Sequence, residues 1–290
     1  MSRYFLPAGA AARDDYDVEV TPESAAWRFS SLRVLTLEPA ATHTLHTEGD
    51  EIVLVPLRGA LSVEVDGAHI DLDGRADVFA GPTDFAYLPV NHVATLHSQA
   101  GGRFALCGAR TDVVLPFRYG PADQVPVELR GAGQSSRQVR NFATPDALEA
   151  GAIIACEVIT PGGNWSSYPA HKHDEASETE SELEEIYYFE IASGPNGQPG
   201  LGFMWTSTSP GLDIDILEEV HDRVTVLVPL GWHGPAVAAP GYDMYYLNVM
   251  AGPSSERAWR ISDHPDQTWI RSTWADQAVD PRLTATQQRG

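Results

Sequence analysis

Residues 171–191 read HKHDEASETESELEEIYYFEI and contain the residues that decide the fold. The end of this stretch, Glu185 to Ile191, is rich in aromatic and β-branched side chains, which is typical of a β-strand. His171 and His173 lie two positions apart, so in extended backbone both rings project from one face while Lys172 points to the other. Two imidazoles on one face of a strand can share a metal ion.

A second stretch, residues 224–233, reads VTVLVPLGWH and predicts a strand that ends in a Pro/Gly turn. A ring at this position, that of His233, can point into the mouth of a barrel. With a carboxylate oxygen from Glu185, the two stretches predict one metal site formed by His171, His173, Glu185 and His233. We expect one divalent ion there, zinc or manganese before iron, cobalt or nickel, although the residue types alone do not choose among them.

Two plainer interpretations compete with this site. A single His-x-His pair is often a pair of ordinary surface or core histidines, so the argument depends on the combination of all four residues. Glu178 is closer to His173 in the sequence than Glu185 is, but it belongs to the acidic run of residues 174–185. Such a run is typical of a solvated loop, and we therefore expect Glu185 to be the ligand.

Composition excludes several kinds of partner. The chain of 290 residues has room for two domains, and its 19 basic against 40 acidic residues give a net charge of −21. That charge disfavours nucleic acid and anionic membranes, which leaves a small molecule or another copy of the chain as the partner. Only two cysteines occur, Cys107 and Cys156, and no long apolar stretch is present, so we expect a cytoplasmic protein without disulfides.

The distribution of short β-rich runs predicts an all-β fold of two tandem barrels. In the first half these runs are residues 26–37, 50–57, 60–65, 85–88, 93–97 and 103–109. In the second half they are residues 153–160, 167–173, 185–191, 200–205, 213–217, 223–229 and 242–251. We assign residues 1–130 to the first barrel, 131–260 to the metal-binding barrel and 261–290 to a tail. We also expect a connector at residues 121–136 and a short helix at 145–149.

Three longer motifs point to a known family. They are TPGGNWSSYPAHKHD at residues 160–174, LEEIYYF at 183–189 and PGYDMYYLNVMAGP at 240–253. These segments resemble the 5-deoxy-glucuronate isomerase family of inositol catabolism, within the cupin superfamily. The resemblance implies a bicupin in which the first barrel is a degenerate copy, because its His43, His46 and His92 match the metal motif only loosely. It also implies a metal-dependent aldose-ketose isomerase that converts 5-deoxy-glucuronate to 2-deoxy-5-keto-gluconate.

Such a reaction needs a group that accepts a proton beside a carbonyl and a positive centre that stabilises the resulting oxygen. Tyr187, which shares a strand face with Glu185, and Asp243 and Tyr245 are the acid/base candidates. Arg137 and Arg257 are candidates for the substrate carboxylate, because a guanidinium can hold it through two parallel hydrogen bonds. For each of these residues an ordinary place in a barrel wall, turn or surface ion pair is the alternative.

Three other functions stay open at this stage. The chain could be a 4-deoxy-5-hexosulose-uronate ketol-isomerase of pectin breakdown, an iron cupin dioxygenase, or a sugar-acid-binding cupin without activity. All three would use the same histidines, so the ligand set does not separate them.

Overall fold

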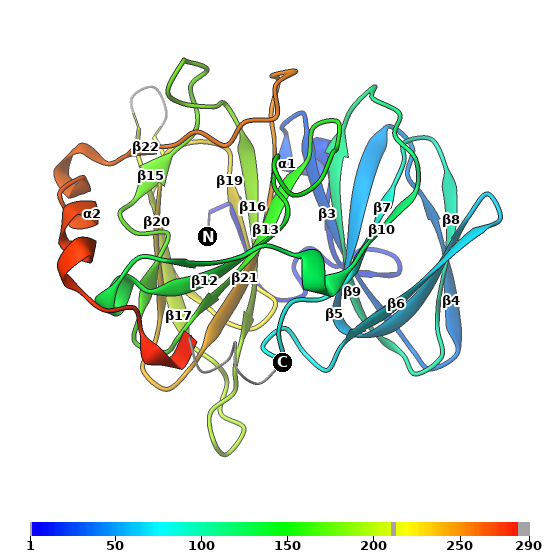
Figure 1. Cartoon of the computed structure of the whole chain (residues 1–290), viewed down its shortest axis with the longest axis horizontal. Helices are drawn as coiled ribbons and strands as arrows, with labels where there is room; N and C mark the ends of the chain where they lie inside the picture. Colours follow the sequence, from blue (N-terminus) through cyan, green and yellow to red (C-terminus); the bar gives the residue numbers. More distant parts are fainter. Residues whose placement is uncertain (1, 210–212, 284–290) are drawn as a thin grey trace.

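The computed structural model describes residues 2–209 and 213–283, which form two β-barrels side by side (Figure 1). The first barrel is one curled sheet of nine strands, in which the order β10-β7-β5-β9-β3-β2 is extended by β4, β6 and β8. Its strands are β2 (Tyr16–Val20), β3 (Ser30–Leu37), β4 (Ala41–His46), β5 (Asp50–Val65), β6 (Ala68–Arg75), β7 (Phe85–Leu88), β8 (Val93–Ser98), β9 (Gly102–Arg110) and β10 (Arg118–Gly120).

The second barrel is built from two sheets. The first has the order β1-β19-β16-β21-β13-β12-β11, and the second has the order β18-β17-β20-β15-β22 with β14 paired to β20. The strands of the first sheet are β1 (Phe5–Leu6), β11 (Val127–Arg130), β12 (Arg137–Ala143), β13 (Ile154–Thr160), β16 (Glu184–Ile191), β19 (Thr225–Val228) and β21 (Met244–Ala251). The strands of the second are β14 (Trp165–Ser166), β15 (His171–Lys172), β17 (Gly202–Ser207), β18 (Ile216–Val220), β20 (Trp232–Ala238) and β22 (Ser262–Asp263).

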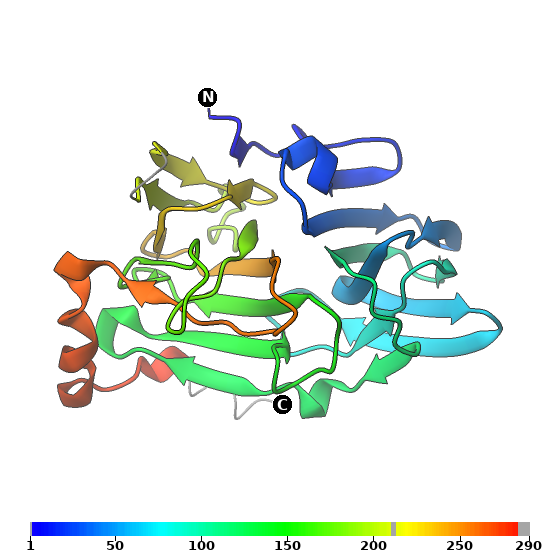
Figure 2. The same cartoon turned by 90° about the horizontal axis from the view of Figure 1, so that it is seen from above.

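Helices are few and short. They are α1 (Pro22–Ala25), α2 (Ile270–Thr273) and the 3-10 turns η1 (Ala122–Gln124), η2 (Gly133–Ser135), η3 (Pro265–Gln267) and η4 (Trp274–Asp276). Among the described residues, no helix has the length and apolarity that a membrane span requires. The segment with α2 runs along the side of the second barrel opposite the first barrel, as Figure 2 shows from above.

The all-β prediction is confirmed, and the differences in detail have physical causes. The prediction of a helix at residues 145–149 is wrong. This segment forms a turn, in which two backbone N–H groups donate to the carbonyl of Thr144. The sequence does not predict β4 or β6, whose side chains are mostly polar and face solvent. The predicted connector contains β11, which pairs with β12, and the amino-terminal β1 pairs with β19 of the second barrel.

Two long strands, β5 in its first half and β16 along its length, are buried on both sides. Along β5, Ile52 and Leu54 belong to the interior of the first barrel, while Val53 and Val55 pack toward the second. On β16 the alternation is the same: Tyr187 lies in the interior of the second barrel. A strand that is buried on both faces has a nearly continuous run of apolar residues. The first half of β5 and most of β16 have such a run in the sequence.

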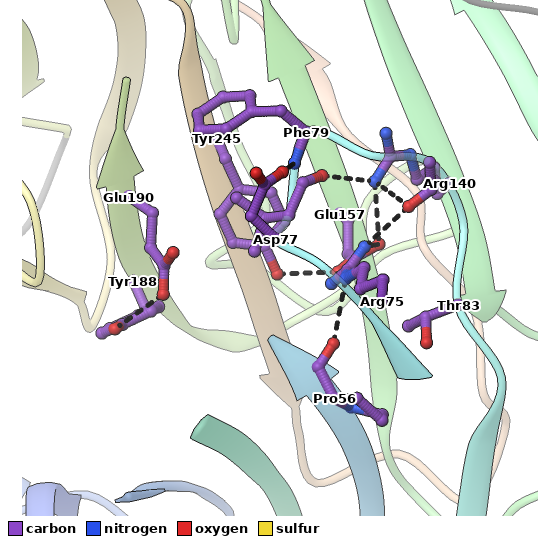
Figure 3. Close-up of polar contacts among 12 residues, drawn as sticks. Pro56, Arg75, Asp77, Phe79, Thr83, Arg140, Glu157, Tyr188, Glu190 and Tyr245 are labelled. Carbon is purple, nitrogen blue, oxygen red and sulfur yellow. Dashed lines mark hydrogen bonds and ion pairs between the residues drawn. The ribbon is translucent and has the colours of Figure 1, made fainter. Parts of the chain in front are cut away.

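A group of charged side chains is buried between the barrels (Figure 3). Glu157 of β13 accepts hydrogen bonds from Arg75 of the first barrel and from the Tyr245 hydroxyl, the latter at 2.8 Å. The Arg140 guanidinium lies 3.6 Å from the same carboxylate. Burial alone would raise the pKa of Glu157, but Arg75 and Arg140 hold it below its ordinary value. Both barrels therefore contribute to one buried ion cluster, in which two guanidinium groups share one carboxylate.

Replacement of Glu157 by glutamine should destabilise the protein by about 3–5 kcal/mol, because two buried guanidinium groups would lose their shared counterion. The free energy of unfolding from urea titration measures this change. Glu256→Gln removes an exposed ion pair with Arg260 and is the matched control, which should cost at most about 1 kcal/mol. Equal effects of the two substitutions would contradict a structural role for the cluster.

The raised pKa of buried Glu190 should make the stability of the protein depend on pH. Burial raises its pKa to about 7, although Arg103 lies 2.9 Å away. Its pKa in the unfolded chain is about 4.3, so the folded protein binds more protons between these values, and the stability gained at low pH is lost as pH rises through about 7.

The variant Glu190→Gln lacks this titration. Its free energy of unfolding relative to wild type should therefore increase by roughly 1–3 kcal/mol between pH 5 and pH 8. Denaturant titrations across this range measure the difference, and Glu64→Gln, on an exposed position of β5, should show no such trend. A constant difference between Glu190→Gln and wild type would contradict the assignment.

Candidate metal centre

Three histidines converge inside the second barrel: His171 on β15, His173 just after β15 and His233 on β20. His171 on β15 is the direct cross-strand neighbour of His233 on β20, and their ring centroids lie 4.4 Å apart. The ring of His173 lies 4.7 Å from that of His233. One nitrogen from each of the three rings lies within 4.8 Å of the others, close enough to bind one ion.

Hydrogen bonds to backbone carbonyls orient two of these rings. Nδ1 of His173 lies 3.1 Å from the Leu183 carbonyl oxygen, and Nδ1 of His233 lies 3.0 Å from the Gly231 carbonyl oxygen. Because a carbonyl only accepts, each Nδ1 carries a hydrogen, and in the neutral ring Nε2 then presents a lone pair. This arrangement is the one found in metal-binding histidines.

Glu185 completes the cluster. Its Oε2 lies 3.0 Å from Nε2 of both His173 and His233. The Nε2 atom of His233 is buried and has no hydrogen-bond partner of acceptable geometry. With Nδ1 protonated, a carboxylate oxygen facing two lone pairs is an unfavourable contact unless a proton or a metal ion lies between them. The donor set therefore fits a bound cation.

The charge states of His171 and Glu185 suit metal binding. Burial, with the neighbouring His233 and His173, holds the pKa of His171 well below its ordinary value, so its ring is neutral at neutral pH. Burial alone would raise the pKa of Glu185, but His233 and His173 keep it well below its usual range. Neutral imidazole and ionised carboxylate are the forms that coordinate divalent first-row metals.

The acidic run between the histidines and Glu185 is an anchored loop. Lys172 faces away from the cluster, as the alternation predicts, and its Nζ lies 2.6 Å from Asp174 and 2.7 Å from Glu180. Glu180 also accepts hydrogen bonds from backbone N–H groups at the start of the loop. Glu178 is exposed, so the structure places Glu185, and not Glu178, beside the histidines.

A cavity of about 190 Å³ opens beside the cluster. His171, Glu185 and Tyr187 line it together with the residues Arg130, Arg137, Val139, Val158, Ser167, Tyr246, Asn248, Trp259, Ile261 and Arg271. The Tyr187 hydroxyl lies 3.2 Å from the Ser167 hydroxyl, and burial raises the pKa of Tyr187 well above its ordinary value. Tyr187 is therefore a protonated phenol that can donate a hydrogen bond to a bound molecule.

The structure separates three of the predicted residues from this cavity. Asp243 is exposed and accepts a hydrogen bond from the Gly162 N–H. Tyr245 points to the other face of β21, where it binds Glu157. Arg257 donates to three backbone carbonyls of the segment from residue 143 to residue 153. Tyr246 and Asn248 do line the cavity. They lie on the face of β21 opposite to Tyr245, and the sequence alone did not predict which of the two faces points inward.

Arg137 does reach the cavity. Its side chain is buried, donates to the backbone carbonyls of Ser135 and Tyr168, and lies over the Trp274 ring at 5.5 Å. Arg271 lies over the same ring at 5.2 Å. Gly131 makes room for this packing, since a Cβ there would lie 2.8 Å from Arg137 Nη1 and the backbone has a φ of +76°.

The chain is similar to curated proteins over most of its length. The chain is 38% identical over 274 residues to the 5-deoxy-glucuronate isomerase of Geobacillus kaustophilus, covering 93% of this chain and 96% of that protein. It is 33% identical over 256 residues to the 5-deoxy-glucuronate isomerase of Bacillus subtilis (strain 168), covering 87% and 91% of the two chains.

Solved structures give the same result for the fold. An IolB-like protein from Salmonella typhimurium LT2 superposes with a TM-score of 0.82 at 32% identity, over 89% of this chain and 96% of that one. The oxalate decarboxylase of Lactobacillus farciminis, at 12% identity and a TM-score of 0.58 over 84% and 82% of the two chains, shares the cupin fold alone. The model of the KduI/IolB family matches residues 5–270. The chain therefore belongs to the KduI/IolB family.

Proposed function

We propose that this chain is a metal-dependent isomerase that converts 5-deoxy-glucuronate to 2-deoxy-5-keto-gluconate. The observation that carries the proposal is a cluster of three histidines and one glutamate beside a cavity, in a chain similar over most of its length to curated 5-deoxy-glucuronate isomerases.

His171, His173, Glu185 and His233 would hold one divalent ion, with zinc or manganese as the first candidates. When bound, this ion supplies a Lewis acid that polarises a carbonyl oxygen and stabilises negative charge on it. The protein shapes the site in two ways: backbone carbonyls fix the tautomers of His173 and His233, and the barrel wall limits the access of water.

Tyr187 supplies a second polar group at the reacting end of the cavity. Its position two residues beyond Glu185 on β16 places both side chains on the same face of the strand. Because its pKa is raised by burial, the phenol keeps its proton and can donate a hydrogen bond to a substrate oxygen that gains negative charge. Ser167, 3.2 Å from the phenol, orients the hydroxyl.

His233→Ala should lower metal affinity at least about tenfold, because the variant loses one of four ligands while the barrel stays folded. The metal content of untagged protein, measured by mass spectrometry after dialysis, checks this. His69→Ala, which removes an exposed histidine of the first barrel, is the control and should retain the wild-type metal content. Full occupancy in the His233→Ala variant would rule out the proposed ligand set.

The metal-loaded protein should convert 5-deoxy-glucuronate to 2-deoxy-5-keto-gluconate, and NMR can follow the loss of the aldehyde signal. Tyr187→Phe should lower kcat about 100-fold, since one hydrogen-bond donor to the developing oxyanion is lost. Tyr119→Phe, an exposed tyrosine of the first barrel, should leave kcat unchanged.

Other outcomes of the same assay would replace the proposal. Turnover of 4-deoxy-5-hexosulose-uronate alone would make the chain an isomerase of the pectin-derived compound. Consumption of oxygen with the sugar acid would indicate a dioxygenase. Sugar-acid binding without any conversion would indicate a binding protein.

A further inference from the structure

The cavity wall away from the histidines carries one buried guanidinium without an ion pair and two side chains with unpaired N–H groups. They belong to Arg137 on β12, Asn248 on β21 and Trp259, which precedes β22. All three can donate hydrogen bonds, and all three line the same cavity as His171 and Glu185. Buried donors without partners cost free energy, so each unsatisfied group in a native structure points to something that it binds.

Arg137 differs from the two other arginines of the cavity. Arg130 forms a bidentate pair with Glu128, and Arg271 forms one with Asp263. Arg137 is 5% exposed, and within the described part of the chain it forms no ion pair and donates only to backbone carbonyls. Burial lowers its pKa to about 10, so it remains charged at neutral pH. A buried guanidinium without a counterion is costly, and an anionic ligand would remove that cost.

Asn248 and Trp259 each have one side-chain nitrogen that donates no hydrogen bond to the described residues. Asn248 is 3% exposed; its oxygen lies 3.9 Å from Cys156 Sγ, while its amide nitrogen has no partner. The indole nitrogen of Trp259 is buried and also unpaired. The Arg130 guanidinium lies 5.6 Å from the centre of the Trp259 ring, and both residues line the cavity.

We infer that Arg137, Asn248 and Trp259 form the recognition wall for a sugar acid whose carbonyl end lies at the histidine cluster. Arg137 binds the terminal carboxylate, and the N–H groups of Asn248 and Trp259 donate to hydroxyl oxygens along the carbon chain. This inference rests on the proposed function and extends it, because it assigns the orientation of the substrate and the basis for preferring an acid over a neutral sugar. It also makes the carboxyl-terminal segment part of the site, since this segment supplies Trp259 and covers Arg137 with Trp274.

Binding measurements test the wall separately from catalysis. The probes are D-gluconate and sorbitol, which differ in that a carboxylate replaces a hydroxymethyl group, and titration calorimetry on metal-loaded protein gives the Kd of each. The wild-type protein should bind gluconate at least about tenfold more tightly than sorbitol. Arg137→Met should weaken gluconate binding about 10- to 100-fold and abolish the preference.

The two N–H donors are tested by near-isosteric changes. Trp259→Phe and Asn248→Leu should each weaken gluconate binding about 3- to 10-fold. Trp205→Phe is the control: it removes an indole N–H that donates to Asp215 on the exposed face of the second barrel, and Trp205 does not line the cavity, so the Kd for gluconate should not change. With 5-deoxy-glucuronate, Trp259→Phe and Asn248→Leu should raise KM and leave kcat within about twofold, as expected for uniform binding contacts.

Three results would overturn the inference: no measurable gluconate binding by the wild-type protein, equal affinity for gluconate and sorbitol, or wild-type affinity in Arg137→Met. These outcomes are distinct from a failure of the proposed function. If the wild-type protein isomerises 5-deoxy-glucuronate and the Arg137→Met variant has the wild-type KM, the recognition wall is refuted and the isomerase activity is not. A protein that binds gluconate through Arg137 but converts no aldose refutes the isomerase alone.

Discussion

The constraint on which the structure depends is the alternation of side chains along β16, a strand buried on both faces. Glu185 and Tyr187 face the cavity, whereas Ile186 and Tyr188 pack between the barrels. A register shift by one residue would exchange the two sets, moving a carboxylate into the apolar contact between barrels and an isoleucine to the histidines. The position of Glu185 beside the histidines and the packing of the two barrels therefore both depend on the register of β16.

Carboxylates at the start of the long strands add a reciprocal connection between the barrels. Glu51, on β5, accepts three backbone N–H groups from residues 151–153 of the second barrel at 2.5–2.8 Å. Glu184, on β16, accepts three from residues 28–30 of the first barrel at 2.6–3.0 Å. Each barrel thus satisfies backbone donors of the other, and these directional bonds fix an orientation that apolar contact alone would leave loosely defined.

The sequence predicts those parts of the site that depend on local spacing. His171 and His173 are two residues apart, and the preference for Glu185 over Glu178 follows from the difference between an acidic loop and an apolar strand. The face of β21 that looks inward could not be predicted, because Tyr245 and Tyr246 are both apolar enough for either side. Only the pairing of β21 with β13 and β16 decides that Tyr246 lines the cavity.

The sequence was least informative where distant segments meet. Trp259, Ile261 and Arg271 belong to a stretch of polar and aromatic residues without strand or helix periodicity, so the pattern indicates a tail and gives no location for it. In the structure they close one side of the cavity. The contacts that place this stretch are those of Trp259 with Arg130 and of Trp274 with Arg137, which pair rings with guanidinium groups more than a hundred residues away.

The net charge of −21 and the proposed anionic substrate are compatible because they act over different distances. Exposed carboxylates repel an anion in solution, but salt screens this repulsion beyond about 8 Å at physiological ionic strength. A buried guanidinium interacts at contact distance in a medium of lower dielectric, where the attraction amounts to about 4 kcal/mol before desolvation is counted. Arg137 can therefore dominate binding inside the cavity while the acidic surface governs only the approach to it.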